Sequence, residues 1–191
     1  MDHWRIEGTH AAAAVVVNFL AVPRGSGLGL AMDKQFMVDQ LAARIRDSLD
    51  VALREQEAAA IEARDGASPS EKRDDARVAL EYSNLARAQG RRALAAREEL
   101  ASIESFRPGK SGSRVRLGDI VEIEDGSTGR TIFLAPVGAG LELTMPDGDG
   151  FVTVVTPASP LGKAIIGREL GDTVEISVRG EDRDWTVTYI G

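Results

Sequence analysis

One segment near the end of the chain organises the interpretation of the whole sequence, and over residues 159–176 it reads SPLGKAIIGRELGDTVEI. Ser159 can cap a helix whose first turn accommodates Pro160. Gly167 can end that helix in a left-handed conformation, and the alternating residues that follow are typical of a strand. The segment therefore predicts a short capped helix over 160–166, a tight turn and a strand.

Composition excludes several classes of protein. The chain has 191 residues, enough for one ordinary domain or two small ones, and no cysteine, so it has neither a disulfide framework nor a thiolate metal site. Its net charge is −7, with about −3 over residues 33–106 and about −4 over 107–191. Neither segment is a basic nucleic-acid module. The two histidines lie at positions 3 and 10, which leaves none for acid–base chemistry in the rest of the chain.

Residues 1–31 do not resemble the rest of the chain. The apolar run Ala11–Val22 is too short to cross a bilayer comfortably, and the segment before it lacks the positive charge of a signal peptide. Residues 23–29 are typical of a loop. We expect 1–31 to be a disordered or artefactual extension, with the helical pattern opening at Met32, and we expect no membrane segment.

Residues 32–106 predict two long amphipathic helices. Apolar residues recur at three- or four-residue steps, and polar residues fill the other faces. The predicted stripes consist of Phe36, Leu41, Ile45, Leu49, Ala52, Leu53, Ala60 and Ile61 on the first helix, and Val78, Leu85, Ala88, Leu94, Ala95 and Ile103 on the second.

The turn between these helices is predicted near residues 65–75. Gly66 can end the first helix, and residues 68–71 (SPSE) form a capping box that starts the second. Because the connection is only about three residues long, the helices must fold back antiparallel as a coiled-coil hairpin. At about 1.5 Å of rise per residue, the hairpin extends about 50 Å.

The pattern changes after the hairpin. Residues 107–113 (RPGKSGS) predict a linker, and residues 114–191 then show period-two alternation separated by turn clusters. With the single short helix at 160–166, this predicts a small antiparallel-sheet domain. The expected fold class is α+β.

The segment at 159–176, preceded by a long hairpin and a linker, resembles the Gre family of bacterial transcript cleavage factors, GreA and GreB. The resemblance covers about residues 33–191. It implies an FKBP-like fold for 114–191, which would dock on RNA polymerase, with Ser159, Pro160, Leu161, Gly162 and Lys163 as candidate contact residues. It also implies that the hairpin enters the secondary channel and that the polymerase hydrolyses the RNA, so the chain itself is not an enzyme.

The tip departs from the family pattern. Gre tips carry an Asp-Leu-x-Glu-Asn core, which is absent here, and the acidic residues present are Asp65, Glu71, Asp74 and Asp75. Two carboxylates on one helical face could complete a magnesium site that polymerase and RNA half build. The ion would be supplied at the polymerase active site and not bound stably by this chain alone. Acidic residues in a first helical turn are equally explained by capping.

A second candidate surface contains Arg87, Arg91 and Arg92 on the second helix. These residues could contact polymerase acids or RNA phosphates, or they could simply pair with Glu98, Glu99 and the acids of the first helix.

The sequence leaves three candidate functions. The first is a monomeric, cytoplasmic elongation factor that binds RNA polymerase, stimulates transcript cleavage in backtracked complexes and meets the nascent RNA 3′ end only indirectly. The second is a channel-binding regulator without cleavage activity. The third is a proline isomerase, against which the four aromatic residues Phe133, Phe151, Trp185 and Tyr189 count, since they are expected to serve the core.

Overall fold

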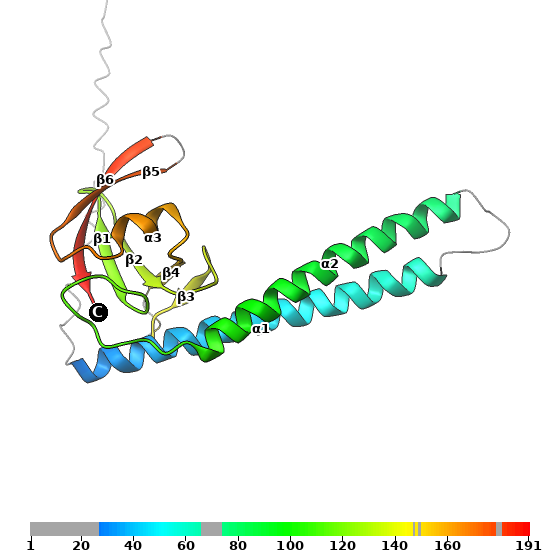
Figure 1. The fold of residues 1–191 in the computed structure, drawn as a ribbon, viewed down its shortest axis with the longest axis horizontal. Coiled ribbons are helices and arrows are strands. Elements are labelled where there is room, and N and C mark those ends of the chain that lie inside the picture. The colour runs from blue at the N-terminus through cyan, green and yellow to red at the C-terminus, as the bar shows by residue number, and fades with distance from the viewer. Residues whose placement is uncertain (1–26, 66–73, 147, 149, 179–180) are drawn as a thin grey trace, which may run out of the picture.

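The computed structural model describes residues 27–65, 74–146, 148, 150–178 and 181–191, with side chains for all of these except 27–33, 65, 74–76, 177, 178 and 181. A helical hairpin made of α1 (Gly27–Asp65) and α2 (Asp74–Ser105) precedes a sheet domain, as Figure 1 shows. The α+β class and the long hairpin are confirmed. α1 begins within the stretch 1–31, and the predicted capping box at 68–71 lies outside the described residues.

The sheet domain contains six strands in the order β3-β4-β2-β1-β6-β5. The strands are β1 (Ile120–Glu124), β2 (Gly129–Leu134), β3 (Glu142–Thr144), β4 (Phe151–Val155), β5 (Thr173–Val178) and β6 (Glu181–Ile190), and the helix α3 (Pro160–Ile165) lies between β4 and β5. The sheet is mixed and not wholly antiparallel as predicted, because β2 and β4 pair in parallel. After β2, residues 135–141 lead to β3 at the edge of the sheet. The chain then turns back, so that β4 lies between β3 and β2.

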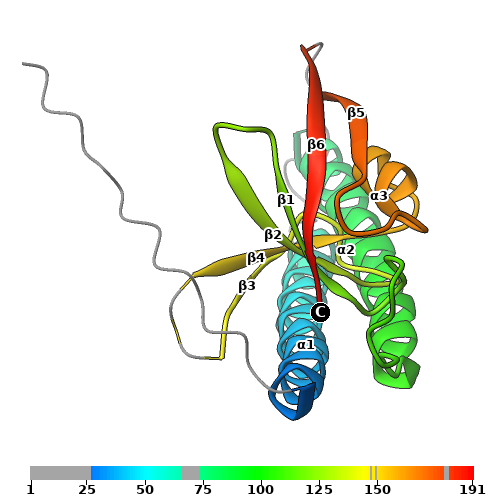
Figure 2. The ribbon, with the colours of Figure 1, turned by 90° about the vertical axis from the view of Figure 1, so that its left-hand side faces the viewer.

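Each face of the sheet has its own hydrophobic core. One core joins the base of the hairpin to one face, through residues such as Leu41, Ile103 and Phe133. The other joins the opposite face to α3, through residues such as Ile165 and Trp185. Figure 2 shows α3 beside β5 and the start of α1 below the strands. The first core therefore positions the hairpin against the sheet domain.

The contact between the two helices is narrower than predicted. Its fully buried members on α2 are mostly small, such as Ala93 and Ala96, with Ile103 at the base. The predicted stripe was right for Leu41, Ile45, Leu49 and Ile103, which are buried, and wrong for Phe36, Ile61, Val78, Leu85 and Leu94, which are exposed. The alanines of α2 allow the two helix backbones to approach closely. Gln89 is also buried in this contact, and its Oε1 has no hydrogen-bond partner among the described residues.

The edge strand β3 is covered by a side chain from the hairpin. The amide of Gln40 donates to the carbonyl oxygen of Thr144 (3.2 Å) and accepts from the Thr144 amide (2.7 Å). Nearby, Gly138 has a φ of +82°, and a Cβ there would lie 2.6 Å from Leu41. The two hydrogen bonds from Gln40 satisfy backbone groups of Thr144 that would otherwise be open to pairing with another chain.

The turn between β1 and β2 is held by one carboxylate. Asp125 Oδ1 accepts hydrogen bonds from the backbone amides and the hydroxyls of Ser127 and Thr128. These bonds, above all the one from the Thr128 amide, hold the pKa of Asp125 well below its usual range. The other carboxylate oxygen accepts from Arg183 at 3.1 Å, which ties the turn to β6.

A buried ion pair connects the hairpin, the linker and the sheet. Lys34 Nζ on α1 lies 2.8 Å from Asp119 Oδ1, and both side chains are 3% exposed. The same ammonium donates to the Gly109 carbonyl oxygen (3.1 Å) and to Ser111 Oγ (3.0 Å) in the predicted linker. Asp119 Oδ2 accepts from the Arg116 amide at 2.7 Å. Every strong donor and acceptor of the pair therefore has a partner, which a buried charge requires.

Replacing one member of this pair should destabilise the whole protein. In the variant Asp119→Ala, Lys34 stays buried without its counter-charge, so we expect the free energy of unfolding to fall by about 3–5 kcal/mol. Urea denaturation followed by circular dichroism measures this. The control is Asp39→Ala, which removes an exposed carboxylate from α1 and should change the free energy by no more than about 0.5 kcal/mol. Equal values for the two variants would contradict the assigned role.

Candidate functional site

The far end of the hairpin carries the acidic residues predicted as metal ligands. Asp65 is the last residue of α1, and Asp74 and Asp75 are the first two of α2, so their backbones lie together at the end remote from the sheet (Figure 1). The side chains of these three residues, and the whole of Glu71, lie outside the described part of the chain. Which of the four carboxylates point the same way therefore stays a prediction.

The backbone geometry at the start of α3 explains most of the residues at 159–163. Ser159 caps α3: its Oγ accepts from the Gly162 amide (3.0 Å) and donates to the Thr156 carbonyl oxygen (2.8 Å). A Cβ on Gly162 would overlap that same carbonyl oxygen. Leu161 packs against the second core. Of the five predicted contact residues, Pro160 and Lys163 are the exposed ones, so they are the members of the segment best able to touch a partner.

The exposed surface beside α3 extends further along the chain than predicted. Ile166 and Leu170 expose 38% and 64% of their area, and Arg168 lies between them and is also exposed. The two apolar residues were missed as candidates because they fall inside a motif interpreted as helix and turn. The structure buries Ile165 and leaves Ile166, which caps the C-terminus of α3, partly exposed.

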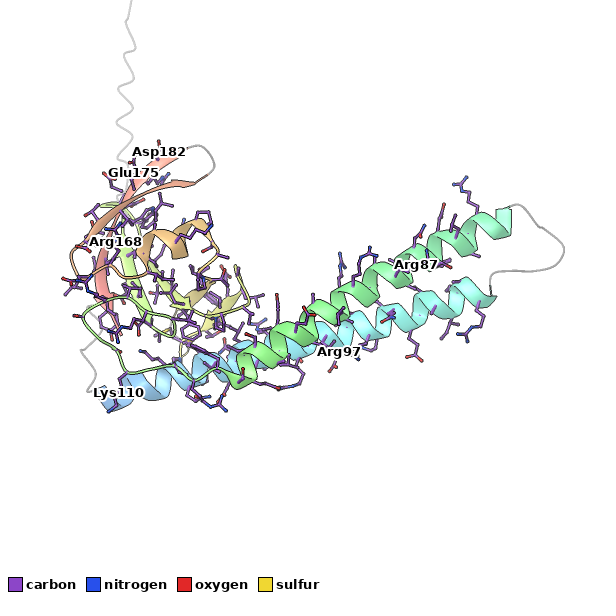
Figure 3. All side chains as sticks on the ribbon, in the orientation of Figure 1. Arg87, Arg97, Lys110, Arg168, Glu175 and Asp182 are labelled. Atoms are coloured by element: carbon purple, nitrogen blue, oxygen red, sulfur yellow. The ribbon has the colours of Figure 1, made fainter. Side chains whose placement is uncertain are left out.

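The three arginines predicted as one surface are divided by the structure. Arg87 and Arg91, four residues apart on α2, share one side of the helix, and Figure 3 marks Arg87 midway along the hairpin. Arg92 lies on a different side, where it lines a groove of about 350 Å³ between α1 and α2 together with Glu55 and Glu99. Among the described residues, none of the three forms an ion pair; the contact of Arg87 is with Asn84 Oδ1 at 3.3 Å.

The described part of the chain offers neither a metal cluster nor a membrane span. It contains no group of three or more His, Asp or Glu side chains placed to hold a metal ion. No helix within it combines the length and apolar character needed to cross a bilayer. The metal finding does not bear on the tip acids, whose side chains are not described.

The aromatic residues of the sheet domain do not converge on one pocket. Phe133 is buried in the first core and Trp185 in the second, on opposite faces of the sheet. The expectation that all four serve the core was wrong for Phe151, which is 70% exposed at the start of β4. An aromatic-lined site of the kind that proline isomerases use is therefore not formed by these residues.

The sheet domain matches a known family. Residues 110–191 match the family model described as "Transcription elongation factor, GreA/GreB, C-term". No curated protein sequence matches the chain significantly.

Solved structures of similar chains belong to Gfh1. The chain is 19% identical to GreA factor homolog 1 (Gfh1) of Thermus thermophilus, with 78% of this chain and 94% of that chain covered and a TM-score of 0.32. It is 17% identical to Thermus aquaticus Gfh1, with 84% and 96% covered and a TM-score of 0.32. A further structure of the transcription factor Gfh1 is 23% identical, with 79% and 93% covered and a TM-score of 0.34. We draw no functional inference from similarity at this level.

The close approach at Gly162 predicts a large cost for adding one methyl group. We expect Gly162→Ala to lower the free energy of unfolding by about 1–3 kcal/mol, because the α3 N-terminus must move away from Thr156. Gly109→Ala is the matched control: its Cβ would meet nothing within 4 Å, so the change should stay within about 1 kcal/mol. Thermal unfolding of both variants measures the difference. A Gly162→Ala protein as stable as the control would show that α3 adjusts freely.

Proposed function

We propose that this chain binds RNA polymerase through its secondary channel and stimulates transcript cleavage in backtracked complexes. It acts as a monomeric cytoplasmic accessory factor, and the polymerase supplies the catalytic centre. The observation that carries the proposal is the match of residues 110–191 to the GreA/GreB C-terminal domain, joined to a long hairpin whose acidic end is remote from it.

The shape of the hairpin supports insertion into a channel. α1 has 39 residues and extends about 58 Å at about 1.5 Å of rise per residue. α2 has 32 residues and runs back along it. The alanine-rich contact keeps the two helices close together, so the hairpin stays slender. The buried pair of Lys34 and Asp119 fixes its base to the sheet domain, so docking of that domain would set the direction of the tip.

The acids at the tip supply the chemistry that the proposal requires. Carboxylate oxygens are the ligands that Mg²⁺ prefers, and one or two protein carboxylates beside phosphates and water are enough. Such an ion, when bound, activates water and stabilises charge at a scissile phosphate. Asp65, Glu71, Asp74 and Asp75 are the residues that would hold it. Asp65 ends α1, and Asp74 and Asp75 begin α2, at the end of the hairpin remote from the sheet domain.

The sheet domain supports docking through the surface beside α3. Pro160, Lys163, Ile166 and Leu170 are all exposed on one continuous stretch of chain. Exposed apolar residues with a flanking positive charge suit a protein surface that is apolar and acidic. The contacts of Ser159, Leu161 and Gly162 inside the domain hold α3 in the position that exposes these residues.

A channel-binding regulator without cleavage activity is the second candidate. The observation that favours it is the absence of the Asp-Leu-x-Glu-Asn core at the tip. Such a protein would compete with cleavage factors for polymerase and leave the RNA unchanged. The same hairpin and docking surface would serve both functions, so the difference lies in the tip alone.

The tip carboxylates can be tested in a backtracked elongation complex with Mg²⁺, with the RNA 3′ end followed on a gel. We expect the wild-type chain to shorten the transcript to products that can be re-extended. The double variant Glu71→Ala with Asp74→Ala should lose this activity by about 10- to 100-fold, the size expected when groups that position a catalytic ion are removed. Binding to the polymerase should be retained.

The matched control is Asp47→Ala with Asp50→Ala, which removes two exposed acids three residues apart on α1 and should leave cleavage unchanged. Retained cleavage in the tip variant would disprove the assigned roles. Polymerase binding by the wild type without any RNA shortening would establish the second candidate.

A further inference from the structure

One side of α2 presents two leucines and two arginines to solvent. Leu80, Arg87, Arg91 and Leu94 are separated by seven, four and three residues, and these steps place them along one line of an α-helix. We call these four residues the outer ridge. The line lies opposite the face that packs on α1, which contains Gln89, Ala93 and Ala96. From Leu80 to Leu94 it extends about 21 Å.

The outer ridge is exposed along its length within the described part of the chain, and the hydrogen bond of Arg87 to Asn84 Oδ1 stays within α2. Leu80 and Leu94 expose 58% and 57% of their area, the highest values among the large apolar residues of the described hairpin. Arg87 and Arg91 are exposed, and neither forms an ion pair with any described carboxylate. Glu81, the acid nearest in sequence to Leu80, is already paired with Arg77 at 3.2 Å. A partner that covers this surface would remove the leucines from water and could pair with the arginines, so both kinds of residue would stabilise the contact.

We propose that the outer ridge docks an acidic protein surface of RNA polymerase. Two carboxylates on that surface would face Arg87 and Arg91, and apolar side chains flanking them would receive Leu80 and Leu94. This inference rests on the proposed function, because it names the chemistry of the polymerase surface that the hairpin meets. The inference goes further than the proposed function in two ways. It gives Leu80 and Leu94 the same importance for binding as Arg87 and Arg91, and it assigns Arg92 no part in the contact.

The leucines distinguish a protein partner from a nucleic acid. Phosphates would engage the arginines of the outer ridge, and they offer an exposed leucine no surface to pack against. A protein surface can instead receive the leucines on its apolar side chains and the arginines on its acids, and arginine is enriched at protein interfaces.

The test compares two double variants in binding to core RNA polymerase that contains no nucleic acid. Leu80→Gln with Leu94→Gln removes the apolar ends, and Arg87→Gln with Arg91→Gln removes the charges; glutamine keeps the helix propensity. Matched controls are Val51→Gln with Ile61→Gln and Arg44→Gln with Arg54→Gln, all exposed positions on α1. Circular dichroism confirms that each variant is folded.

We expect each outer-ridge variant to weaken binding at least about tenfold, with the controls within about twofold of wild type. The arginine variant should also lose most of the salt dependence of binding, whereas the leucine variant should keep it. Wild-type binding that neither outer-ridge variant weakens would overturn this inference and leave the proposed function intact. The binding assay is repeated with an elongation complex that contains RNA. A loss seen only for the arginine variant, and only in that complex, would make RNA the occupant and overturn this inference as well. If the wild type does not bind polymerase, the proposed function fails and this inference fails with it.

Discussion

The buried contact of Lys34 with Asp119 is the point on which the arrangement of the molecule depends. It joins α1 to the start of the sheet, and through Gly109 and Ser111 it also holds the segment that connects them. A pair so fully buried is tolerated only because each charged atom has partners. Gln40 on the same helix then closes the edge strand β3, and Leu41 extends the hydrophobic core into the sheet. The hairpin and the sheet domain therefore form one unit with a defined direction.

The sequence predicted most of this fold. Period-two alternation located the strands, and Ser159, Pro160 and Gly167 located α3 and its end. The hairpin followed from apolar repeats and the lack of proline inside its helices. Two features escaped. The parallel pairing of β2 with β4 depends on how residues 135–141 cross the sheet, which no local pattern encodes. The buried role of Lys34 depends on groups 75 to 85 residues away in sequence.

Helical periodicity failed where the helix contact is narrow. It selected Phe36, Leu85 and Leu94 for the interior because they are large and apolar, but the helices meet through alanines such as Ala93 and Ala96. Large residues such as Leu41, Ile45 and Leu49 are buried in the same core, so periodicity alone did not separate the buried apolar positions from the exposed ones. The same effect hid the outer ridge, since Leu94 was counted as core. Charge patterning found Arg87 and Arg91, although it could not separate them from Arg92, which is only one residue further but faces another side of the helix.

The segment at 159–163 stood out in the sequence because it is short and dense in residues with special backbone roles. The structure explains Ser159 and Gly162 by the geometry of α3, and it leaves Lys163 and residues 166–170 exposed. Contact of this segment with a partner stays a prediction. The acidic tip is different, since its chemistry needs groups that this chain does not contain. The residues at 159–163 are therefore explained by contacts within the chain, whereas the proposed role of the tip depends on groups outside it.

Cross-linking from the far end of the hairpin tests the central claim most directly. The chain has no cysteine, so a single Glu62→Cys near the end of α1 can carry a photoactivated cross-linker, with Ser127→Cys in the β1–β2 turn as the comparison. Bound to core RNA polymerase, the probe at position 62 should react with residues inside the secondary channel, next to the catalytic centre, and the probe at 127 should not. Cross-links from position 62 confined to the outer surface of the polymerase would contradict insertion of the hairpin into the channel.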